Sequence, residues 1–208
     1  MSPHPGVRDL EDWALRALER WPHVPGLFGW LGLDRRGRWT IRGEIISRPQ
    51  IIETINRNYE ADAYGRWFFQ NGPQRGYVNL ETAPLIAYTQ DNRLMTHTQL
   101  EINAPTRAYL DEEGSLMLAT EHGPAALMDS DLEWALSRMT CQGEAVRDDH
   151  VFSALAIANA HATTLALNLA SGSVPIWRLD RALAPSALGF VRNPTPREGE
   201  ALSVREND

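Results

Sequence analysis

Residues 37–59 read GRWTIRGEIISRPQIIETINRNY, and residues 65–84 read GRWFFQNGPQRGYVNLETAP. In the first stretch, apolar and polar residues alternate around Trp39, as on a strand with one buried face. Ser47 and Gln50 then have the spacing of a capping box, which predicts the start of a helix. In the second stretch, two strand-like runs flank residues 71–75, which predicts a hairpin. Together they predict a strand, a helix and a hairpin in under fifty residues, without a catalytic signature.

A similar order of elements comes again farther along the chain. Asp34–Gly37 and Asp111–Gly114 both have the Asp-x-x-Gly form of a tight turn. A strand-like run follows each turn, and Ser130 with Glu133 repeats the capping-box spacing. The pattern predicts two small turn–strand–helix units. Such units are common, so the sequence leaves open whether these two come from a duplication.

The rest of the chain adds helices at both ends. An apolar stripe with helical spacing predicts a helix from Asp9 to about Trp21. Residues 149–171 are apolar almost all round, which predicts a long buried helix that ends before Gly172. Proline, arginine and glutamate dominate from Asn193 onward, so we expect a disordered tail. The expected parts are an N-terminal helix (1–26), a first α+β unit (27–105), a second α+β unit with the long helix (106–192) and the tail (193–208).

We therefore predict an α+β fold with a mostly antiparallel sheet, the two small repeated units and a helical C-terminal segment. The predicted core contains the residues on the apolar phase of each element: Trp39, Ile41, Ile51, Ile55, Trp67, Phe69, Val78, Leu80, Leu116, Leu132 and Leu136. The long apolar helix needs a second surface to cover it. That surface is either a twofold-related copy of the chain, which gives a homodimer, or the N-terminal helix.

Composition excludes several classes of function. The 208 residues carry 20 positive and 27 negative side chains, so a net charge of −7 provides no basic field for nucleic acid. All positive side chains are arginines, which excludes a Schiff-base lysine and a P-loop lysine. The single cysteine, Cys141, forms no intrachain disulfide. Without a signal-peptide core or a membrane-length apolar run, we expect a cytoplasmic protein that binds neither nucleic acid nor membranes.

One polar group has the residue types of a binding pocket. Guanidinium forks and aromatic faces bind anionic or planar ligands, and both are concentrated in and around the predicted hairpin. The alternative is that the aromatic residues form the core and the arginines its exposed rim. The candidate ligand contacts are Arg48, Arg66, Trp67, Asn71, Gln74 and Arg75.

Metal and cofactor sites are only weakly indicated. His97 and Glu101 are four residues apart on a predicted strand, and Glu121 and His122 follow, but no spacing matches a metal-ligand motif. His97 and His122 are the metal candidates, against the alternative of solvated strand residues. Three glycines lie three residues apart, which indicates close backbone packing and not a dinucleotide site: Gly26, Gly29 and Gly32. We predict no cofactor.

The fold-determining stretch also contains a set of motifs at fixed spacing: Gly37, Trp39, Gly43, Ile46 and Arg48-Pro49, then Gly65-x-Trp67-Phe68, then Val78-x-Leu80-Glu81-x-Ala83-Pro84. Over roughly residues 27–135, the chain resembles an uncharacterised, mainly proteobacterial family of the domain-of-unknown-function kind. The resemblance implies an α+β fold with repeated motifs and a role in signalling or ligand sensing, without catalytic residues. Arg36 stands where the family often has Asp or Gly, and Thr82 replaces its second acid.

These observations predict a non-enzymatic cytoplasmic module for sensing or protein interaction, with a signalling role. Its partner would be a small anionic ligand or another protein. The alternative is an enzyme or binding protein that acts on a small anionic metabolite through the arginine and aromatic group. The sequence contains no paired carboxylates, triad or metal motif that would favour the enzyme.

Overall fold

A computed structural model describes residues 26–200, which belong to two compact units. Among these residues, unit 1 contains 26–82 and 190–200, and unit 2 contains Ala83–Gly189. The sequence-based division placed its boundary between residues 105 and 106. The predicted N-terminal helix lies outside the described residues.

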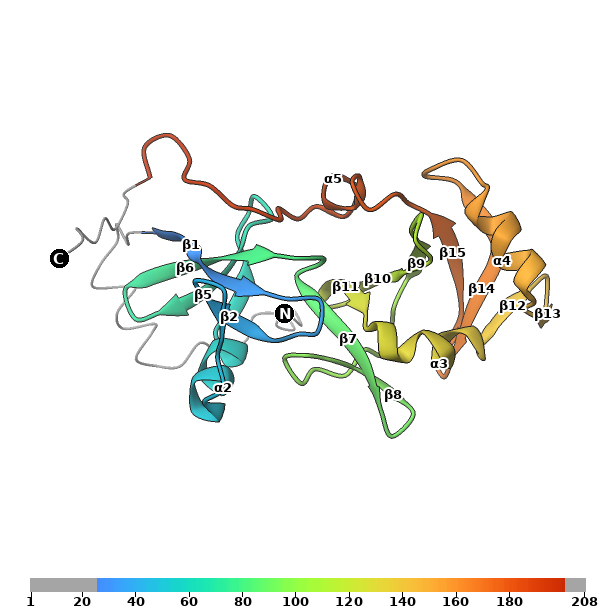
Figure 1. The fold of residues 1–208 in the computed structure, drawn as a ribbon, viewed down its shortest axis with the longest axis horizontal. Helices are drawn as coiled ribbons and strands as arrows, with labels where there is room; N and C mark the ends of the chain where they lie inside the picture. The colour runs from blue at the N-terminus through green and yellow to red at the C-terminus, as the bar shows by residue number, and fades with distance from the viewer. Residues whose placement is uncertain (1–25, 201–208) are drawn as a thin grey trace, which may run out of the picture. The chain divides into compact units, whose positions relative to one another are not determined.

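Unit 1 is built on a six-stranded sheet with the strand order β3-β2-β1-β6-β5-β4. Figure 1 labels β1, β2, β5 and β6 of this sheet. β1 and β6 are parallel, and the other neighbouring strands pair antiparallel. A helix, α2, lies beside β2 and β5. The elements are β1 (Gly26–Leu33), β2 (Trp39–Ile41), β3 (Glu44–Ile45), α2 (Pro49–Arg57), β4 (Tyr59–Ala61), β5 (Trp67–Asn71) and β6 (Gln74–Leu80).

The core of unit 1 lies between the sheet and α2. Trp39 is only 1% exposed, and its indole N–H donates a hydrogen bond to Asn56 Oδ1 of α2 at 2.8 Å. Its ring meets Tyr59 edge-on with the centroids 4.9 Å apart, and Tyr59 contacts Trp67 at the same distance. Ile55 of α2 is also buried, with 2% of its surface exposed. Trp39, Tyr59 and Trp67 therefore fill the helix-facing side of the sheet.

Unit 2 is built on a nine-stranded sheet with the order β13-β12-β14-β15-β9-β10-β11-β7-β8. β7 pairs with β11 and β9 with β15 in parallel. Its strands are β7 (Leu85–Gln90), β8 (Arg93–Thr96), β9 (Arg107–Leu110), β10 (Leu116–Thr120), β11 (Gly123–Leu127), β12 (Met139–Cys141), β13 (Glu144–Ala145), β14 (Ala162–Leu169) and β15 (Gly172–Arg178). Its helices are η1 (Asp129–Asp131), α3 (Leu132–Leu136), α4 (Asp148–Leu155) and α5 (Ala184–Leu188).

The predicted α+β class with a helical C-terminal segment is wrong, because strands dominate both units. The predicted helix over 149–171 is divided: α4 ends at Leu155, and β14 begins at Ala162. From there the period is two, since Leu165 and Leu167 are buried while Ala166 between them is partly exposed. A composition that is apolar throughout gave no sign of this change of period.

The repetition in the structure is not the predicted one. Trp39–Arg57, which we call copy 1, corresponds to Met139–Leu155, which we call copy 2 and which starts one hundred residues later. In both, a strand turns back through two residues with positive φ and leads into a helix. The φ angles are 51° and 87° at Arg42 and Gly43, and 51° and 91° at Gln142 and Gly143. The strand registers also agree, because residue 40 pairs with 45 and residue 140 with 145.

Neither predicted capping box forms. The helix that Ser47 and Gln50 were expected to cap begins at Pro49, with Arg48 as the N-cap residue and no side-chain cap. Proline suits the first helical position because its fixed φ is helical and it lacks an N–H that would need a partner. The N-cap of α3 is Asp131, again without a side-chain cap. None of the helices within residues 26–200 has the length and apolar character that a membrane crossing requires.

Candidate functional site

The face of the unit 1 sheet away from α2 contains an open depression of about 340 Å³, which we call the hollow. Trp39 faces α2, and Gly32 and Thr40 pair directly on the next rung, so they face the hollow. Volumes of this size are typical of small-molecule sites. The side chains and backbone that line the hollow include Trp30, Gly32, Asp34, Thr40, Arg42, Asn79, Glu81 and Asn193.

An arginine stacked on a tryptophan forms one wall of the hollow. The guanidinium carbon of Arg42 lies 3.8 Å from the ring centroid of Trp30, within cation–π range. The backbone holds the pair in place, since the Arg42 N–H donates to the Trp30 carbonyl at 2.7 Å. Arg42 and Gly43 form the two-residue turn between β2 and β3, where both residues need a positive φ. The turn thus fixes where the guanidinium stands.

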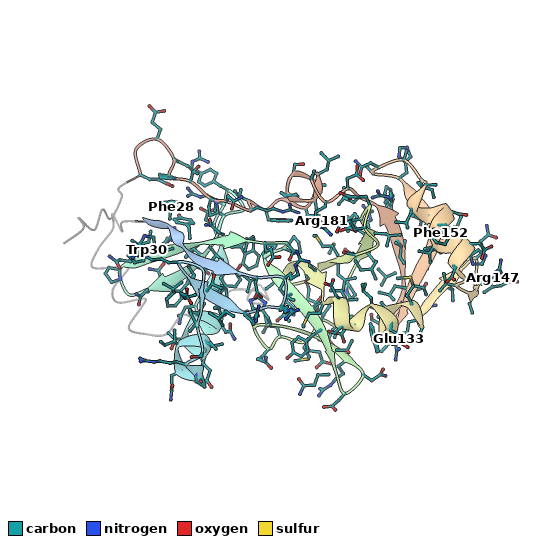
Figure 2. The ribbon with its side chains drawn as sticks, viewed as in Figure 1. Phe28, Trp30, Glu133, Arg147, Phe152 and Arg181 are labelled. Atoms are coloured by element: carbon teal, nitrogen blue, oxygen red, sulfur yellow. The ribbon has the colours of Figure 1, made fainter. Side chains whose placement is uncertain are left out.

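An irregular β1 places Trp30 on this wall, and Figure 2 labels it together with Phe28 on the same strand. The pairing of β1 with β6 shifts register between Leu27 and Leu31. Gly29, at the centre of the shift, has φ 73° with no heavy atom near its missing Cβ, so it is required for its conformation. The predicted close packing holds at Gly32, where a Cβ would lie 2.6 Å from Thr40 Oγ1.

The charges around the hollow leave one positive charge without a counterpart. Glu81 accepts hydrogen bonds from the Arg35 backbone N–H at 2.9 Å and from its Nε at 2.6 Å, and the backbone bond is the largest cause of its lowered pKa. Asp34 accepts from Arg38 Nε at 2.7 Å. Within residues 26–200, the Arg42 guanidinium has no hydrogen-bond or ion-pair partner. Two carboxylates therefore face three arginines, and Arg42 is the cation in excess.

After unit 2 the chain returns to unit 1 and passes the end of β6 (Figure 1). The Val191 N–H donates to the Gly65 carbonyl at 2.9 Å, and the Leu80 N–H donates to the Arg192 carbonyl at 2.8 Å. Asn193 then lines the hollow. We call residues 190–200 the return segment. The return segment includes residues 193–200, which were predicted to belong to a disordered tail.

The end of the return segment is held by a buried arginine. Arg66 is 5% exposed and donates through Nε to Asp62 Oδ2 at 2.7 Å. Its two terminal nitrogens donate to the Glu200 carboxylate at 2.8 and 2.7 Å, and also to the Thr195 carbonyl and the Tyr77 hydroxyl. These bonds lower the pKa of Glu200 to about 2. The network fixes the return segment beside the hollow.

The structure separates the six candidate ligand contacts into several places. Arg66 is enclosed by the network just described. Arg75 lies on the same sheet face, where its Nε donates to Gln70 Oε1 at 3.3 Å and its guanidinium stacks 4.5 Å from the Phe68 ring. Trp67 is buried on the opposite face, next to Tyr59.

The other three candidates lie at the ends of elements. Arg48 is exposed at the start of α2. Asn71 and Gln74 pair across the Gly72–Pro73 turn between β5 and β6, and Gln74 offers its carbonyl to the Gln70 side chain at 3.1 Å. The hairpin is therefore confirmed, with a turn of two residues instead of a longer loop. None of these three lines the hollow.

The two histidine candidates have separate hydrogen-bond partners. His97 Nδ1 accepts from the Ile86 N–H at 3.2 Å, whereas His122 Nε2 bonds to the Glu101 carbonyl at 2.8 Å. The Glu121 carboxylate accepts from two backbone N–H groups, the shorter bond being 2.6 Å from Asn103. Within residues 26–200, no three His, Cys, Asp or Glu side chains are grouped to hold a metal ion.

Sequence reasoning missed the residues of the hollow, above all Trp30, Arg42 and Asn79. One signal was present, because Arg42-Gly43 between two short apolar runs is a candidate two-residue turn. Asn193 offered no such signal. It reaches the hollow only because the chain returns to unit 1 after completing unit 2, which no local pattern encodes.

Residues 10–195 match the model of the family DUF2944, described as a protein of unknown function (DUF2946). The chain belongs to this family. The membership confirms the resemblance to an uncharacterised domain-of-unknown-function family, and the match extends well beyond residues 27–135. A search of curated proteins gave no significant match.

Two solved structures are similar to the DUF2944 chain. A DUF1285 family protein from Silicibacter pomeroyi DSS-3 has a TM-score of 0.50 and 13% identity, covering 84% of this chain and 90% of that one. A DUF1285 family protein from Shewanella baltica OS155 has a TM-score of 0.38 and 16% identity, covering 49% and 85%. At this identity the first similarity concerns the fold alone.

Proposed function

We propose that this protein is a non-enzymatic sensing module whose ligand is a small metabolite with one negative charge and a planar ring. The observation that carries the proposal is the Arg42 guanidinium, which stacks on Trp30 at the hollow and lacks a carboxylate partner within residues 26–200. Guanidinium groups bind carboxylates and phosphates through paired N–H donors. Their planar faces also stack on rings, so the exposed side of Arg42 suits a planar anion.

The remaining polar groups of the hollow suit a neutral part of the same ligand. Asn79 and Asn193 bring amides and Thr40 a hydroxyl, which donate and accept hydrogen bonds. The two carboxylates are already neutralised by Arg35 and Arg38, so they do not repel an anion as free carboxylates would. The surroundings of the hollow therefore favour a ligand with a single negative charge, placed at Arg42.

The place of the hollow along the chain supports the proposed sensing role. The chain passes between the units at Thr82–Ala83 and at Gly189–Phe190. Glu81, directly before the first passage, and Asn193, shortly after the second, both line the hollow. A ligand that contacts both residues acts on both connections. A ligand shifts a conformational equilibrium only through such state-dependent contacts.

Calorimetric titration of the full chain with benzoate and benzamide tests this proposal. The two probes share a ring and a similar shape, but only benzoate is charged. We expect benzoate to bind at least about tenfold more tightly, because only the anion pairs with Arg42. Arg42→Gln, which installs the residue of copy 2, should remove that preference.

Arg48→Gln is the matched control, because Arg48 is another exposed arginine of unit 1 and does not line the hollow. Its benzoate affinity should equal that of the unmodified chain. Equal losses in both variants would show a general charge effect and contradict the site. If a panel of ring-bearing anions and inorganic phosphate all fail to bind, a protein partner becomes the better explanation.

The cytoplasmic location and the signalling role stay parts of this proposal. The homodimer stays a prediction with a weaker basis, because the long apolar helix on which it rested is divided into α4 and β14. One feature still favours it: Phe152 on α4 is 70% exposed. Sedimentation of the full chain at micromolar concentration distinguishes monomer from dimer.

A further inference from the structure

Unit 2 contains a cavity of about 120 Å³ between its sheet and the helices α3 and α4. The sheet side is made by buried apolar residues from five strands: Leu110, Leu116, Met139, Leu165 and Ile176. Val151 of α4 and two leucines of α3 close the helix side. No polar side chain lines it. A cavity of this kind stays dry, because water there would lack hydrogen-bond partners.

Comparison with copy 1 explains why the cavity exists. Met139 of copy 2 occupies the position of Trp39 in copy 1, whose indole fills the space beneath α2. The helices match with an offset of 99 residues, because the Arg48 carbonyl accepts from residues 51 and 52 and the Arg147 carbonyl from 150 and 151.

With that offset, two further positions under the helix carry smaller side chains in copy 2. Ala154 replaces Ile55, and Val151 replaces Ile52. Ala154 and Ile55 are both buried. Each of the three differences removes volume on the same side of the strand. Copy 2 therefore lacks the ring that copy 1 supplies from its own chain.

We propose that this cavity is a binding site for a small apolar ring compound, which takes the place that the Trp39 indole takes in copy 1. A dry cavity only slightly larger than this one accepts benzene in another protein, at about 150 Å³. Met139 suits such a ligand, since its thioether is flexible and makes favourable contacts with aromatic rings. Leu136 of α3, 43% exposed, lies at the rim and marks the side of entry.

The site is independent of the hollow. It is lined by residues of unit 2 alone, it is apolar throughout, and it takes a neutral ligand, whereas the hollow belongs to unit 1 and favours an anion. Failure of benzoate binding would therefore leave this inference standing, and failure of benzene binding would leave the proposed function standing.

Benzene titrated into the full chain, labelled with ¹³C at the methionine methyl groups, tests the inference. We expect a saturable shift of the Met139 methyl signal and a higher melting temperature. Met139→Phe places a ring in the cavity and should weaken benzene binding at least tenfold. Met95→Leu changes a methionine of β8 that does not line the cavity, and it should bind benzene as the unmodified chain does.

Val151→Leu fills the cavity from the helix side and gives a second test if Met139→Phe does not fold. It should also weaken benzene binding. Two results would overturn the inference: no saturable shift with benzene in the unmodified chain, or benzene binding that neither filling variant weakens. The second result would place the bound ring elsewhere.

Discussion

Copy 1 and copy 2 have the same backbone conformation, but the open space next to each lies on opposite sides of the strand. In copy 1, Trp39 fills the side that faces the helix, and the hollow lies on the other side of the sheet. In copy 2, the open space is on the helix side, next to Met139. The same hairpin and helix thus accompany an open polar depression in one unit and an apolar cavity in the other.

The two copies also differ in the residues at the turn, on the side where copy 1 borders the hollow. The Arg42 N–H donates to Trp30, and the Gln142 N–H donates to Thr164, so Thr164 is the counterpart of Trp30. Copy 2 therefore lacks both the guanidinium and the indole of the stack. The comparison teaches that the backbone repeat determines where a site can form, and a few side chains determine its chemistry.

The largest effect should come from making copy 1 resemble copy 2. Trp39→Met removes a buried ring and leaves Asn56 without its indole donor. We expect the free energy of unfolding, measured with urea, to fall by about 2–4 kcal/mol. Met139→Leu is the control and should cost less than about 1.5 kcal/mol. Equal losses in the two variants would contradict the claim that only copy 1 is filled.

The next effect concerns the return segment of unit 1. Glu200→Gln removes the charge that pairs with buried Arg66, and we expect a loss of about 1–3 kcal/mol in urea unfolding. Glu198→Gln changes an exposed neighbour and should stay within about 0.5 kcal/mol of the unmodified chain. A Glu200 variant as stable as its control would show that the pair does not hold the segment.

The same pair predicts a pH dependence. Glu200 has a pKa of about 2 in the folded chain, below its ordinary value of 4.5. A lowered carboxyl pKa stabilises the fold fully above the ordinary value, and this stabilisation is lost as the pH falls toward 2. The stability difference between the unmodified chain and Glu200→Gln should therefore shrink from pH 4.5 downward. A difference that stays constant over this range would contradict the assignment.

The two turns should respond alike. Gly43 and Gly143 have φ angles of 87° and 91°, and no heavy atom lies near either missing Cβ. Alanine at each position should therefore cost about 1 kcal/mol through backbone conformation alone. Melting curves of Gly43→Ala and Gly143→Ala measure this. A cost at one turn only would weaken the equivalence of the copies.

The variant Trp30→Thr should have the smallest effect on stability and a large effect on benzoate binding. Trp30→Thr installs the residue of copy 2 and removes the cation–π contact with Arg42, which at an exposed site is worth about 0.5–1 kcal/mol. Benzoate affinity should fall at least about tenfold, because the guanidinium loses its platform. Unchanged affinity in the calorimetric titration would show that the stack does not form the site.

Local patterns predicted part of the unit 1 sheet. The buried Trp39 and Trp67 and the hairpin at 71–75 are confirmed, because alternation and turn residues act over a few positions. Phe68 and Trp67 point to opposite faces of β5, and both are buried because both faces are covered. Ile41, which was predicted for the core, is 44% exposed.

What the sequence did not predict depends on distant parts of the chain. Arg66 was a candidate for a ligand contact or an exposed rim, yet it is buried because Glu200 returns to it from 134 residues away. The hollow requires Trp30, Asn79 and Asn193 from three separate segments. The strand at 162–169 was hidden because its apolar composition resembles that of a buried helix.

The most direct test of the account is one NMR experiment on the full chain, with ¹⁵N-labelled tryptophan and ¹³C-labelled methionine methyl groups, titrated first with benzoate and then with benzene. The account predicts that benzoate shifts the Trp30 indole signal and leaves the Met139 methyl signal in place, while benzene does the reverse. Both probes shifting the same signal, or neither probe shifting either one, would contradict the claim that one repeated backbone carries two chemically different sites.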